Sequence, residues 1–435
     1  MIAAAGPALH PAEAARRAAT APGAFWLTAP AADEVGVARD MVGAAPTRVV
    51  RGSSLEALEA VWREERAWWT AGGAPPPAGV PIGAGWLSYD LGRRMAGLPP
   101  REPAPPPDAW PELEYHFHDA VWVRPREGEA RILARDEAAA RRLEERLRVP
   151  APERPAPRLG ALRGDHPTQV FLDGVRRVLE YLRAGDAYQV NLSRRLSASC
   201  TPGDPVWLAA ALARRAPAPQ AAWIAAASGD GYVVGSSPER FLAVDPDGVV
   251  ETRPIKGTRP RGADAAADAE ARAELRASEK DLAEHVMIVD LERNDLGRVC
   301  ETGSVEVAGV GRIVALPTVF HMVSTVRGRL RRDVGLAALL AATFPGGSIT
   351  GAPKRRAMQI IDELEPAARG PYTGATGWLG AAGDLDLGIA IRTALVTGDR
   401  LSLSVGGGIV IDSTPESELA ETAVKAVAFD LLRSR

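Results

Sequence analysis

The spacing of apolar and polar residues along the chain predicts both strands and helices. Apolar and polar residues alternate in RVV before RGSS and in AVWVRPREGEARILA (residues 120–134), which predicts antiparallel strands. Residues 53–69, SSLEALEAVWREERAWW, have the spacing of a helix. Downstream, β-rich runs such as GYVVGSS, GVVETRPI and RLSLSVGGGIVI alternate irregularly with long amphipathic segments. This pattern lacks a strict βαβ order and predicts an α+β chain whose antiparallel sheets are covered by helices.

A glycine-rich turn leads into a predicted helix in FPGGSITGAPKRRAMQIIDELE, residues 344–365. Its expected buried positions recur at helical spacing: Met358, Ile361 and Leu364. Exposed amides in such a turn and in the first helical turn attract anions. The motif is not a P-loop, because Lys354 follows Ala-Pro rather than glycine. A plain strand-to-helix turn explains the segment equally well from its residues alone.

A second predicted helix carries two carboxylates one turn apart. In residues 412–432, DSTPESELAETAVKAVAFDLL, Ser413 or Thr414 is expected to cap the helix, with Pro415 in its first turn. The expected buried stripe is Ala420, Val424, Val427 and Leu431, and another face carries Glu418, Glu421 and Lys425. Stacked carboxylates suit a hard cation, whereas a solvated charged face is the commoner reason for such spacing.

A third predicted helix, SEKDLAEHVMIVDLERNDLGR (residues 278–298), follows the same pattern. It is expected to bury Leu282, Val286 and Val289 and to present Asp281 and Glu284 one turn apart. If the two helices converge, their carboxylates are the kind of ligand that Mg²⁺ accepts beside water and substrate oxygens.

Several polar residues interrupt apolar or proline-braced segments. Lys256, in ETRPIKGTRPRG, becomes a nucleophile if burial disfavours its ammonium form, although lysines beside prolines are usually exposed. Glu239, in GSSPERF, is a proton donor if buried, with a salt bridge to Arg240 or Arg253 as the alternative. Three more residues remain open between packing and ligand contact: His321, Tyr372 and Arg392.

Composition excludes several classes of protein. The 435 residues carry a formal net charge of −3 without a basic stripe, which argues against nucleic acid as a partner. Two cysteines and no clustered histidines argue against a disulfide framework or a zinc site and favour a reducing compartment. No export signal and no long apolar segment is recognised, so we expect a cytoplasmic protein without a membrane span. Proline-rich stretches at Pro99–Trp110 and Val149–Arg158 suggest a soft boundary between residues 1–160 and 161–435.

Taken in order, the motifs resemble the chorismate-utilising enzymes. The resemblance covers roughly residues 165–435 and rests on GDAYQVNLSRR, GSSPERF, ETRPIKGT, DLAEHVMIVDLERNDLGRV, FHMVSTVRG, GGSITGAPKRRAMQIIDELE, YTGATGW, IAIRTALV and VGGGIVIDSTPESELAETAVKA. GAGWLSYDLGRR, at Gly83–Arg94, is similar to the N-terminal part of anthranilate and aminodeoxychorismate synthases. The resemblance implies two orthogonally packed antiparallel sheets with outer helices. It also implies a substrate cleft between the lobes, with residues 1–160 as scaffold and 161–435 as the catalytic region.

Within the family, PIKGT is similar to component I of the aminodeoxychorismate synthases, which has lysine where component I of anthranilate synthase usually has alanine. This implies that Lys256 attacks the chorismate ring while Glu239 protonates the departing 4-hydroxyl. Ammonia then displaces the lysine and leaves an amine at C4, for 4-aminobenzoate and folate synthesis. Anthranilate synthase component I is the alternative, and a non-catalytic chorismate-binding subunit is a third.

The resemblance also implies the remaining site residues. Glu284, Glu418 and Glu421 would hold Mg²⁺, with Asp281 reached through water, and His321 falls on an active-site histidine of the family. Backbone and hydroxyl donors to substrate carboxylate oxygens would come from Ser348, Thr350, Gly351, Gly406, Gly407 and Gly408. Tyr372 and Arg392 would grip the enolpyruvyl carboxylate, and Lys425 would add positive charge nearby.

Two departures narrow the expected function. Gln189 stands near the place where family members that add water to the ring carry lysine, which argues against isochorismate or salicylate synthesis. Neither Cys200 nor Cys300 lies in the sequence context of an amidotransferase nucleophile. A separate glutamine amidotransferase subunit, or free ammonia, is therefore expected to supply nitrogen.

Overall fold

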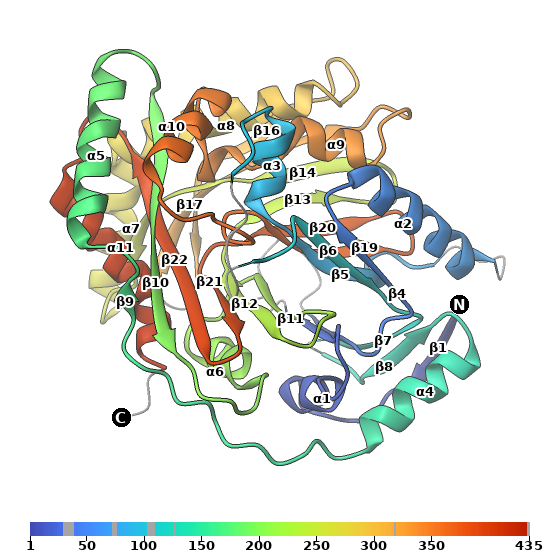
Figure 1. The fold of residues 1–435 in the computed structure, drawn as a ribbon. Coiled ribbons are helices and arrows are strands. Elements are labelled where there is room, and N and C mark those ends of the chain that lie inside the picture. The colour runs from blue at the N-terminus through green and yellow to red at the C-terminus, as the bar shows by residue number, and fades with distance from the viewer. Residues whose placement is uncertain (29–38, 72–75, 102–108, 126, 317–318, 433–435) are drawn as a thin grey trace.

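The computed structural model describes residues 1–28, 39–71, 76–101, 109–125, 127–316 and 319–432 (Figure 1). Most of the first proline-rich stretch, residues 102–108, lies outside this part of the chain. The N-terminus lies beside β1 and α4, on the opposite side of the molecule from α5 and α11 (Figure 1).

Two antiparallel sheets form the centre of the fold in the described part of the chain. The larger has 12 strands, with β9 (Arg163–Gly164) added beside β10, in the order β1 (Ile2–Ala5), β8 (Arg131–Ala134), β7 (Ala120–Pro125), β3 (Arg39–Gly43), β2 (Phe25–Thr28), β11 (Gln220–Ala225), β12 (Gly231–Ser237), β21 (Thr393–Thr397), β22 (Arg400–Ile409), β10 (Gln189–Ser199) and β18 (Gly351–Ala352).

The smaller sheet has 10 strands. With β16 (Glu306–Ala315) paired to β17, its order is β15 (Ile255–Pro260), β17 (Val319–Arg329), β14 (Val249–Arg253), β13 (Arg240–Val244), β20 (Leu385–Ile389), β19 (Ala375–Gly380), β5 (Pro81–Leu87), β6 (Leu113–Phe117) and β4 (Arg48–Gly52). The prediction of an α+β chain with two antiparallel sheets is confirmed.

Helices flank the sheets, and several begin at a residue whose side chain caps them. They are α1 (Pro11–Ala18), α2 (Leu55–Thr70), α3 (Tyr89–Met95), α4 (Glu137–Arg148), α5 (Thr168–Arg183), α6 (Trp207–Arg215), α7 (Ala265–Ala277), α8 (Glu279–Gly297), α9 (Leu336–Thr343), the 3-10 turn η1 (Gly347–Ile349), α10 (Lys354–Leu364) and α11 (Pro415–Asp430). Ser278 caps α8, and Thr414 forms a capping box with Ser417 at α11. No helix in the described residues has the length and apolar character needed to cross a membrane.

Strands from both sides of residue 160 pair within each sheet. In the larger sheet β2 pairs with β11, and in the smaller sheet β5 pairs with β19. The expected boundary lies in the extended segment between α4 and β9. Where the sheets meet, aromatic side chains from both pack together, including Phe25, Trp86 and Trp378. Burial of such rings removes a large apolar area from water and holds the sheets together.

The expected buried stripes of α8 and α11 were largely wrong. Val289 is buried, but Leu282 and Val286 are exposed, and so are Ala420, Val424, Val427 and Leu431. The buried positions of α11 are instead Glu418, Thr422, Ala426 and Phe429, and those of α8 include His285, Glu292 and Asp295. Both helices therefore turn polar side chains toward the protein interior. On α10, by contrast, Met358 and Ile361 are buried as predicted.

Candidate active site

A bulge in β15 places the Lys256 side chain. Lys256 pairs with Met322 of β17 and Thr258 with His321, so the register shifts by one residue between them. Gly257 sits in the bulge with φ +77°. A Cβ there would lie 2.9 Å from Leu275 and 3.1 Å from Asp281, so glycine is required both by conformation and by space.

The bare backbone of β22 lies directly against the Lys256 amine. A Cβ at Gly408 would lie 2.9 Å from Lys256 Nζ and 2.8 Å from Gln189 Nε2. Gln189 is fully buried on the neighbouring strand β10, and both polar atoms of its amide lack a hydrogen-bond partner among the described residues. Glycine at position 408 therefore leaves space for the Lys256 amine and the Gln189 amide beside backbone that carries no side chain.

Burial lowers the pKa of Lys256 from its ordinary value. The carboxylates of Glu284, Glu239 and Glu421 work against this shift, and the positive charge of Lys425 adds to it. Within the described residues, no hydrogen bond or ion pair holds the amine. An amine with a lowered pKa and no partner is a stronger nucleophile than an ordinary lysine.

Glu239 lies in the short connection between β12 and β13, 4% exposed. Burial raises the pKa of its carboxyl to about 7, while the Ser348 hydroxyl, the Ile255 amide and the positive charges of Lys256 and Arg392 oppose the rise. The Ile255 amide donates to Glu239 Oε1 at 3.3 Å, and Ile255 directly precedes Lys256. A buried carboxyl that keeps its proton near neutral pH is suited to act as a general acid.

His321 and Arg392 complete this side of the site. His321 is 2% exposed, its Nδ1 lies 2.9 Å from the Thr258 hydroxyl, and its Nε2 is buried without a partner. Burial and the nearby charge of Arg392 lower the pKa of His321 to about 3, so the ring is neutral. Arg392 has φ +48°, which is rare for a residue other than glycine, and its guanidinium is attracted to Glu239.

Two of the three predicted metal-binding glutamates converge on Gly407. A Cβ at Gly407 would lie 3.1 Å from Glu418 Oε2 and 3.4 Å from Glu421 Oε1. Glu418 accepts a hydrogen bond of 2.6 Å from Ser413, and Glu421 pairs with Lys425 at 2.6 Å. Lys425 also donates to the Gly406 carbonyl at 2.7 Å.

Glu284, from α8, faces the same region. The charges of Lys256 and Glu421 lie close enough to influence its pKa. Burial raises the pKa values of Glu284 and Glu418. For Glu421 burial is the largest cause and acts in the same direction, but the lysines Lys425, Lys256 and Lys280 together outweigh it and leave the pKa lowered. Asp281 is instead paired with Arg259 at 3.1 Å. Glu418 is buried, Glu284 is half-buried and the Glu421 side chain is 51% exposed. Carboxylates held in like-charged company match a divalent cation in ligand type and in charge.

These carboxylates do not form a ready-made metal cage. Among the residues that the structure describes, no three His, Cys, Asp or Glu side chains lie close enough together to hold a metal ion. The contact of Glu418 with Ser413 and of Glu421 with Lys425 engages Oε1 of each carboxylate, so one oxygen of each is already in use.

The turn before α10 supplies one free hydroxyl. Ser348 is buried in η1 and its Oγ has no hydrogen-bond partner in the described residues. The Thr350 hydroxyl, in contrast, donates to the Gly346 carbonyl at 2.8 Å. Gly351 pairs with Val190 of β10, and a Cβ at Gly351 would clash with the Gln189 carbonyl. Ser348 is thus the residue of this group whose hydroxyl is not held within the turn, and it lies close enough to Glu239 to lower the pKa of that carboxyl.

Tyr372 lies in a separate polar cluster. Its ring packs against Arg369, with the guanidinium carbon 5.9 Å from the ring centroid, and burial raises the pKa of its phenol. Arg392, its expected companion, faces Glu239 and His321. The structure therefore assembles Lys256, Glu239, His321, Arg392, Ser348 and Gly408 around one region, with Gly407 and the glutamates beside it.

Comparison with known proteins decides the family. A family model described as chorismate binding enzyme matches residues 23–430. The chain belongs to this family. An anthranilate synthase component 1 of Haloarcula marismortui is 39% identical over 410 residues, which cover 89% of this chain and 79% of that protein.

Proteins named aminodeoxychorismate synthase are also similar to this chorismate-binding enzyme. An aminodeoxychorismate synthase component 1 of Klebsiella aerogenes is 41% identical over 339 residues, covering 78% of this chain and 74% of that protein. An aminodeoxychorismate synthase of Streptomyces pristinaespiralis is 48% identical over 244 residues, or 56% of this chain, and this match spans 33% of that protein. Both synthase names thus occur among relatives of comparable identity.

A solved structure of the family has the same fold. The crystal structure of anthranilate synthase component I from Streptococcus pneumoniae TIGR4 superposes with a TM-score of 0.77 at 28% identity, covering 92% of this chain and 94% of that one. The menaquinone-specific isochorismate synthase from Escherichia coli shares the fold at 19% identity and a TM-score of 0.78.

Sequence reasoning gave no contact at this candidate site to several polar residues of β10. Gln189, Asn191 and Ser193 are all buried on β10, although they alternate with the apolar residues Val190 and Leu192. A strand that buries its apolar side and also its polar side lies beneath a site or a polar network. Polar residues at every second position, next to a glycine-rich partner strand, were the signal in the sequence.

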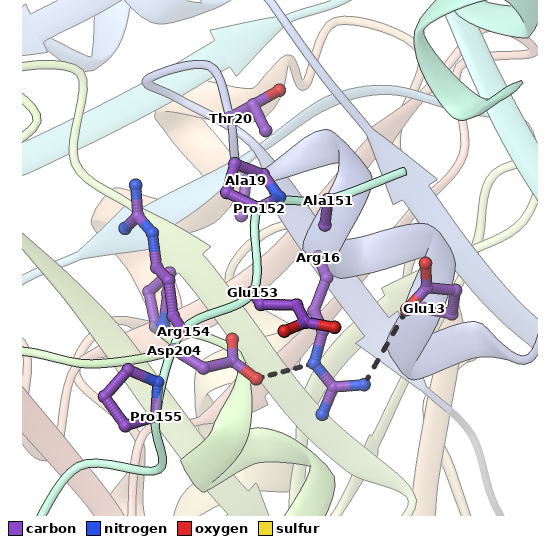
Figure 2. Close-up of a pocket in the computed structure, with 11 residues that line it drawn as sticks. Glu13, Arg16, Ala19, Thr20, Ala151, Pro152, Glu153, Arg154, Pro155 and Asp204 are labelled. Atoms are coloured by element: carbon purple, nitrogen blue, oxygen red, sulfur yellow. Dashed lines mark hydrogen bonds and ion pairs between the residues drawn. The ribbon is translucent and has the colours of Figure 1, made fainter. Parts of the chain in front are cut away.

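An open cavity of about 580 Å³ lies elsewhere, between α1, residues 151–155 and the turn before α6 (Figure 2). Arg16 occupies it and pairs with Asp204 at 2.5 Å and with Glu13 at 3.9 Å. None of the predicted site residues lines this cavity, whose charged lining residues are Glu13, Arg16, Glu153, Arg154 and Asp204. Its size reflects open surface, so the chemistry of the chorismate-binding enzyme is assigned to the Lys256 region.

Proposed function

We propose that this chorismate-binding enzyme aminates chorismate at C4, with ammonia as the nitrogen source and Mg²⁺ as the cofactor, to form 4-amino-4-deoxychorismate. The observation that carries the proposal is the Lys256 amine. It lies against the open backbone of Gly408 with a lowered pKa, and no side chain in the described residues holds it. The similarity to aminodeoxychorismate synthases of Klebsiella aerogenes and Streptomyces pristinaespiralis supports the same assignment.

The proposed reaction has two displacements. In the first, the neutral Lys256 amine forms a C–N bond to the ring, the bond between C4 and its hydroxyl breaks, and Glu239 donates the proton with which that hydroxyl leaves as water. In the second, ammonia forms the C4–N bond and the lysine departs as an amine. Two easier steps thereby replace one difficult displacement. The raised pKa of Glu239, about 7, supports its role as the acid.

Glu284, Glu418 and Glu421 would hold the Mg²⁺. The bound ion would neutralise charge on a dianionic substrate and orient its ring carboxylate. Lys425, now paired with Glu421, would be released toward the substrate when a cation takes its place. Ser348 and Arg392, which both lie near Glu239, are the residues that we propose to bind substrate carboxylate oxygens.

Ammonia would come from a separate glutamine amidotransferase subunit, or from solution. The product would feed synthesis of 4-aminobenzoate and then folate, and we propose that the enzyme works in the cytoplasm. These assignments follow from the proposed reaction and from the component names of relatives such as the Klebsiella aerogenes protein.

Anthranilate synthase component I is the second candidate. The 39% identity to the Haloarcula marismortui protein, which covers 89% of this chain, favours it. The two reactions differ in product, because anthranilate synthase aminates C2 and eliminates pyruvate. Incubation of the purified protein with chorismate, Mg²⁺ and ammonium separates them. We expect no anthranilate fluorescence, and 4-aminobenzoate only after a lyase is added. Strong anthranilate fluorescence would reject the proposal.

Mass spectrometry tests the nucleophile directly. Lys256 is one of only four lysines in the chain, with Lys280, Lys354 and Lys425, so a substrate adduct can be assigned to one peptide. With chorismate and Mg²⁺ but no ammonium, we expect the adduct on Lys256.

Replacement of Lys256 tests the role of this amine by its effect on turnover. We expect Lys256→Ala to lose at least about 1000-fold in ammonia-dependent turnover while chorismate binding is mostly kept, because the amine acts in bond making. Lys256→Arg is the matched control, since it keeps the positive charge and should be equally inactive. Full turnover by Lys256→Ala would remove the covalent route.

A further inference from the structure

A buried ion pair lies behind the candidate site, between Arg369 and Glu365. Both side chains are almost fully buried, at 2% and 5% exposure. Arg369 donates from Nε to Glu365 Oε2 at 2.8 Å and from Nη2 to Oε1 at 2.7 Å. Arg369 also lies over the Tyr89 ring, 4.5 Å from its centroid. Such a two-pronged pair is geometrically rigid because the planar guanidinium fits one carboxylate orientation.

The remaining donors of Arg369 reach three separate segments of the chain. Its guanidinium donates to the Asn191 carbonyl on β10 at 2.7 Å, to the Ile349 carbonyl in η1 at 3.0 Å and to the Thr373 hydroxyl at 3.1 Å. Glu365 Oε1 adds a second link to β10, because it accepts from both the amide and the hydroxyl of Ser193, at 2.7 and 2.8 Å.

Two of these segments carry residues that the structure brings to the site, and the third carries Tyr372, which the sequence resemblance assigns to the substrate. Ile349 lies between Ser348 and Thr350, and Thr373 follows Tyr372 in the chain with an uncommon φ of +57°. The strand β10 carries Gln189, whose amide lies beside Gly408. Lys256, in contrast, is on β15, and Arg369 makes no hydrogen bond to that strand in the described residues. The ion pair thus links the segments that we propose to bind substrate. It makes no hydrogen bond, in the described residues, to the strand that carries Lys256.

We propose that Arg369 and Glu365 are positioning residues that set the geometry of the chorismate-binding groups on β10, η1 and the Tyr372 turn. This inference rests on the proposed location of the site, but not on which product the enzyme forms. Loss of the pair should displace the groups that grip the substrate. A displacement of about 1 Å in groups that position a substrate lowers catalytic efficiency about 100-fold.

The kinetic signature distinguishes positioning from mere stability. A variant that only unfolds more easily has fewer active molecules, so kcat falls while KM stays constant. A variant whose binding groups are displaced has a raised KM, while the Lys256 step at saturating chorismate is largely kept. We expect Arg369→Lys to raise KM for chorismate about 30-fold or more with kcat changed less than about fivefold.

Two further variants make the test independent of folding. The double variant Glu365→Leu/Arg369→Met removes both charges and keeps the volume, and such replacements of buried ion pairs are often neutral or stabilising. It should remain folded and still show the raised KM. Arg93→Lys is the matched control, because Arg93 is also buried and forms a two-pronged pair with Asp362, at 2.8 Å for each contact. Its KM should stay within about twofold.

The experiment measures chorismate consumption with ammonium and Mg²⁺, chorismate binding by calorimetry without ammonium, and the melting temperature of each variant. A raised KM and weakened binding in both Arg369 variants, with the Arg93 control unchanged, support positioning. A folded double variant with normal KM and normal binding overturns it, as does an equal KM change in the control. Product identity, read from the unmodified enzyme, tests the proposed function separately.

Discussion

Helices α10 and α11 differ in what they bury: α10 buries apolar side chains, whereas α11 buries polar side chains beside Ala426 and Phe429. On α10 the apolar residues Met358 and Ile361 face the core. On α11 the buried positions include Glu418 and Thr422, while Val424 is 71% exposed. The difference teaches that apolar periodicity predicts the buried face of a helix only where the helix packs on a core. Where it packs on a site, the chain accepts the cost of burying polar groups.

The largest expected effect comes from the two glutamates of α11 that converge on Gly407. Glu418→Ala and Glu421→Ala should each lower turnover at least about 100-fold at limiting Mg²⁺, with partial recovery at high Mg²⁺, because each removes a proposed metal ligand. Titration of turnover against Mg²⁺ measures this effect. Val424→Ala, on the outer face of the same helix, is the control and should leave the titration unchanged. An equal loss in the control would break the contrast between the two faces.

The next effect tests the apolar face of α10. Ile361 is 2% exposed in the core cluster, so Ile361→Ala should lower the free energy of unfolding by about 2–4 kcal/mol through lost burial and an unfilled cavity. Denaturant unfolding monitored by circular dichroism measures the change. KM for chorismate in the folded fraction should stay normal. A stability loss below about 1 kcal/mol would show that this face does not carry the core packing assigned to it.

The pH dependence of turnover tests the buried carboxyl of Glu239. Because burial raises the pKa of Glu239 to about 7, its protonated form is lost above that pH, and turnover should fall there by up to about tenfold per pH unit. Assays need a constant concentration of free ammonia, since that also varies with pH. Glu239→Gln should be nearly inactive and show no such fall. A flat profile through pH 7 to 9 would remove Glu239 as the acid.

The stability of the protein should respond to the same group. The unfolded chain ionises Glu239 at an ordinary pKa, below the raised value of the folded state, so the folded protein binds the extra proton between them. Stability therefore falls as pH rises from about 4.5 to about 7, by roughly 3 kcal/mol at most. Glu239→Gln should lose less stability over that range. Unfolding at pH 5 and pH 8 compares the two proteins.

The smallest effect is expected on the outer face of α11. Val424→Ser and Val427→Ser should each change the free energy of unfolding by less than about 0.5 kcal/mol, because both side chains are largely exposed. Thermal unfolding of the isolated protein measures this. A loss comparable to that of Ile361→Ala would mean that the outer stripe is buried after all.

Much of the fold was predictable because it depends on local signals. Alternation predicted β7 and β8, which pair with each other, and helical spacing predicted α2, which Ser54 caps. The ordered motifs also indicated the chemistry, since Lys256 and Glu239 were singled out before any contact was known. Such features are visible in sequence because each depends on residues within a few positions of one another.

Burial and mutual contact were decided only by tertiary structure. No local pattern shows that Gly408 of β22 lies against Lys256 of β15, or that Arg369 reaches β10 and η1, because these residues are far apart in the chain and meet through sheet pairing. Nor does helical spacing show which side of α11 faces inward. The amino-acid sequence by itself determined which residues are able to do the chemistry. The pairing of distant strands decided which of them lose water, and with it their pKa values and their partners.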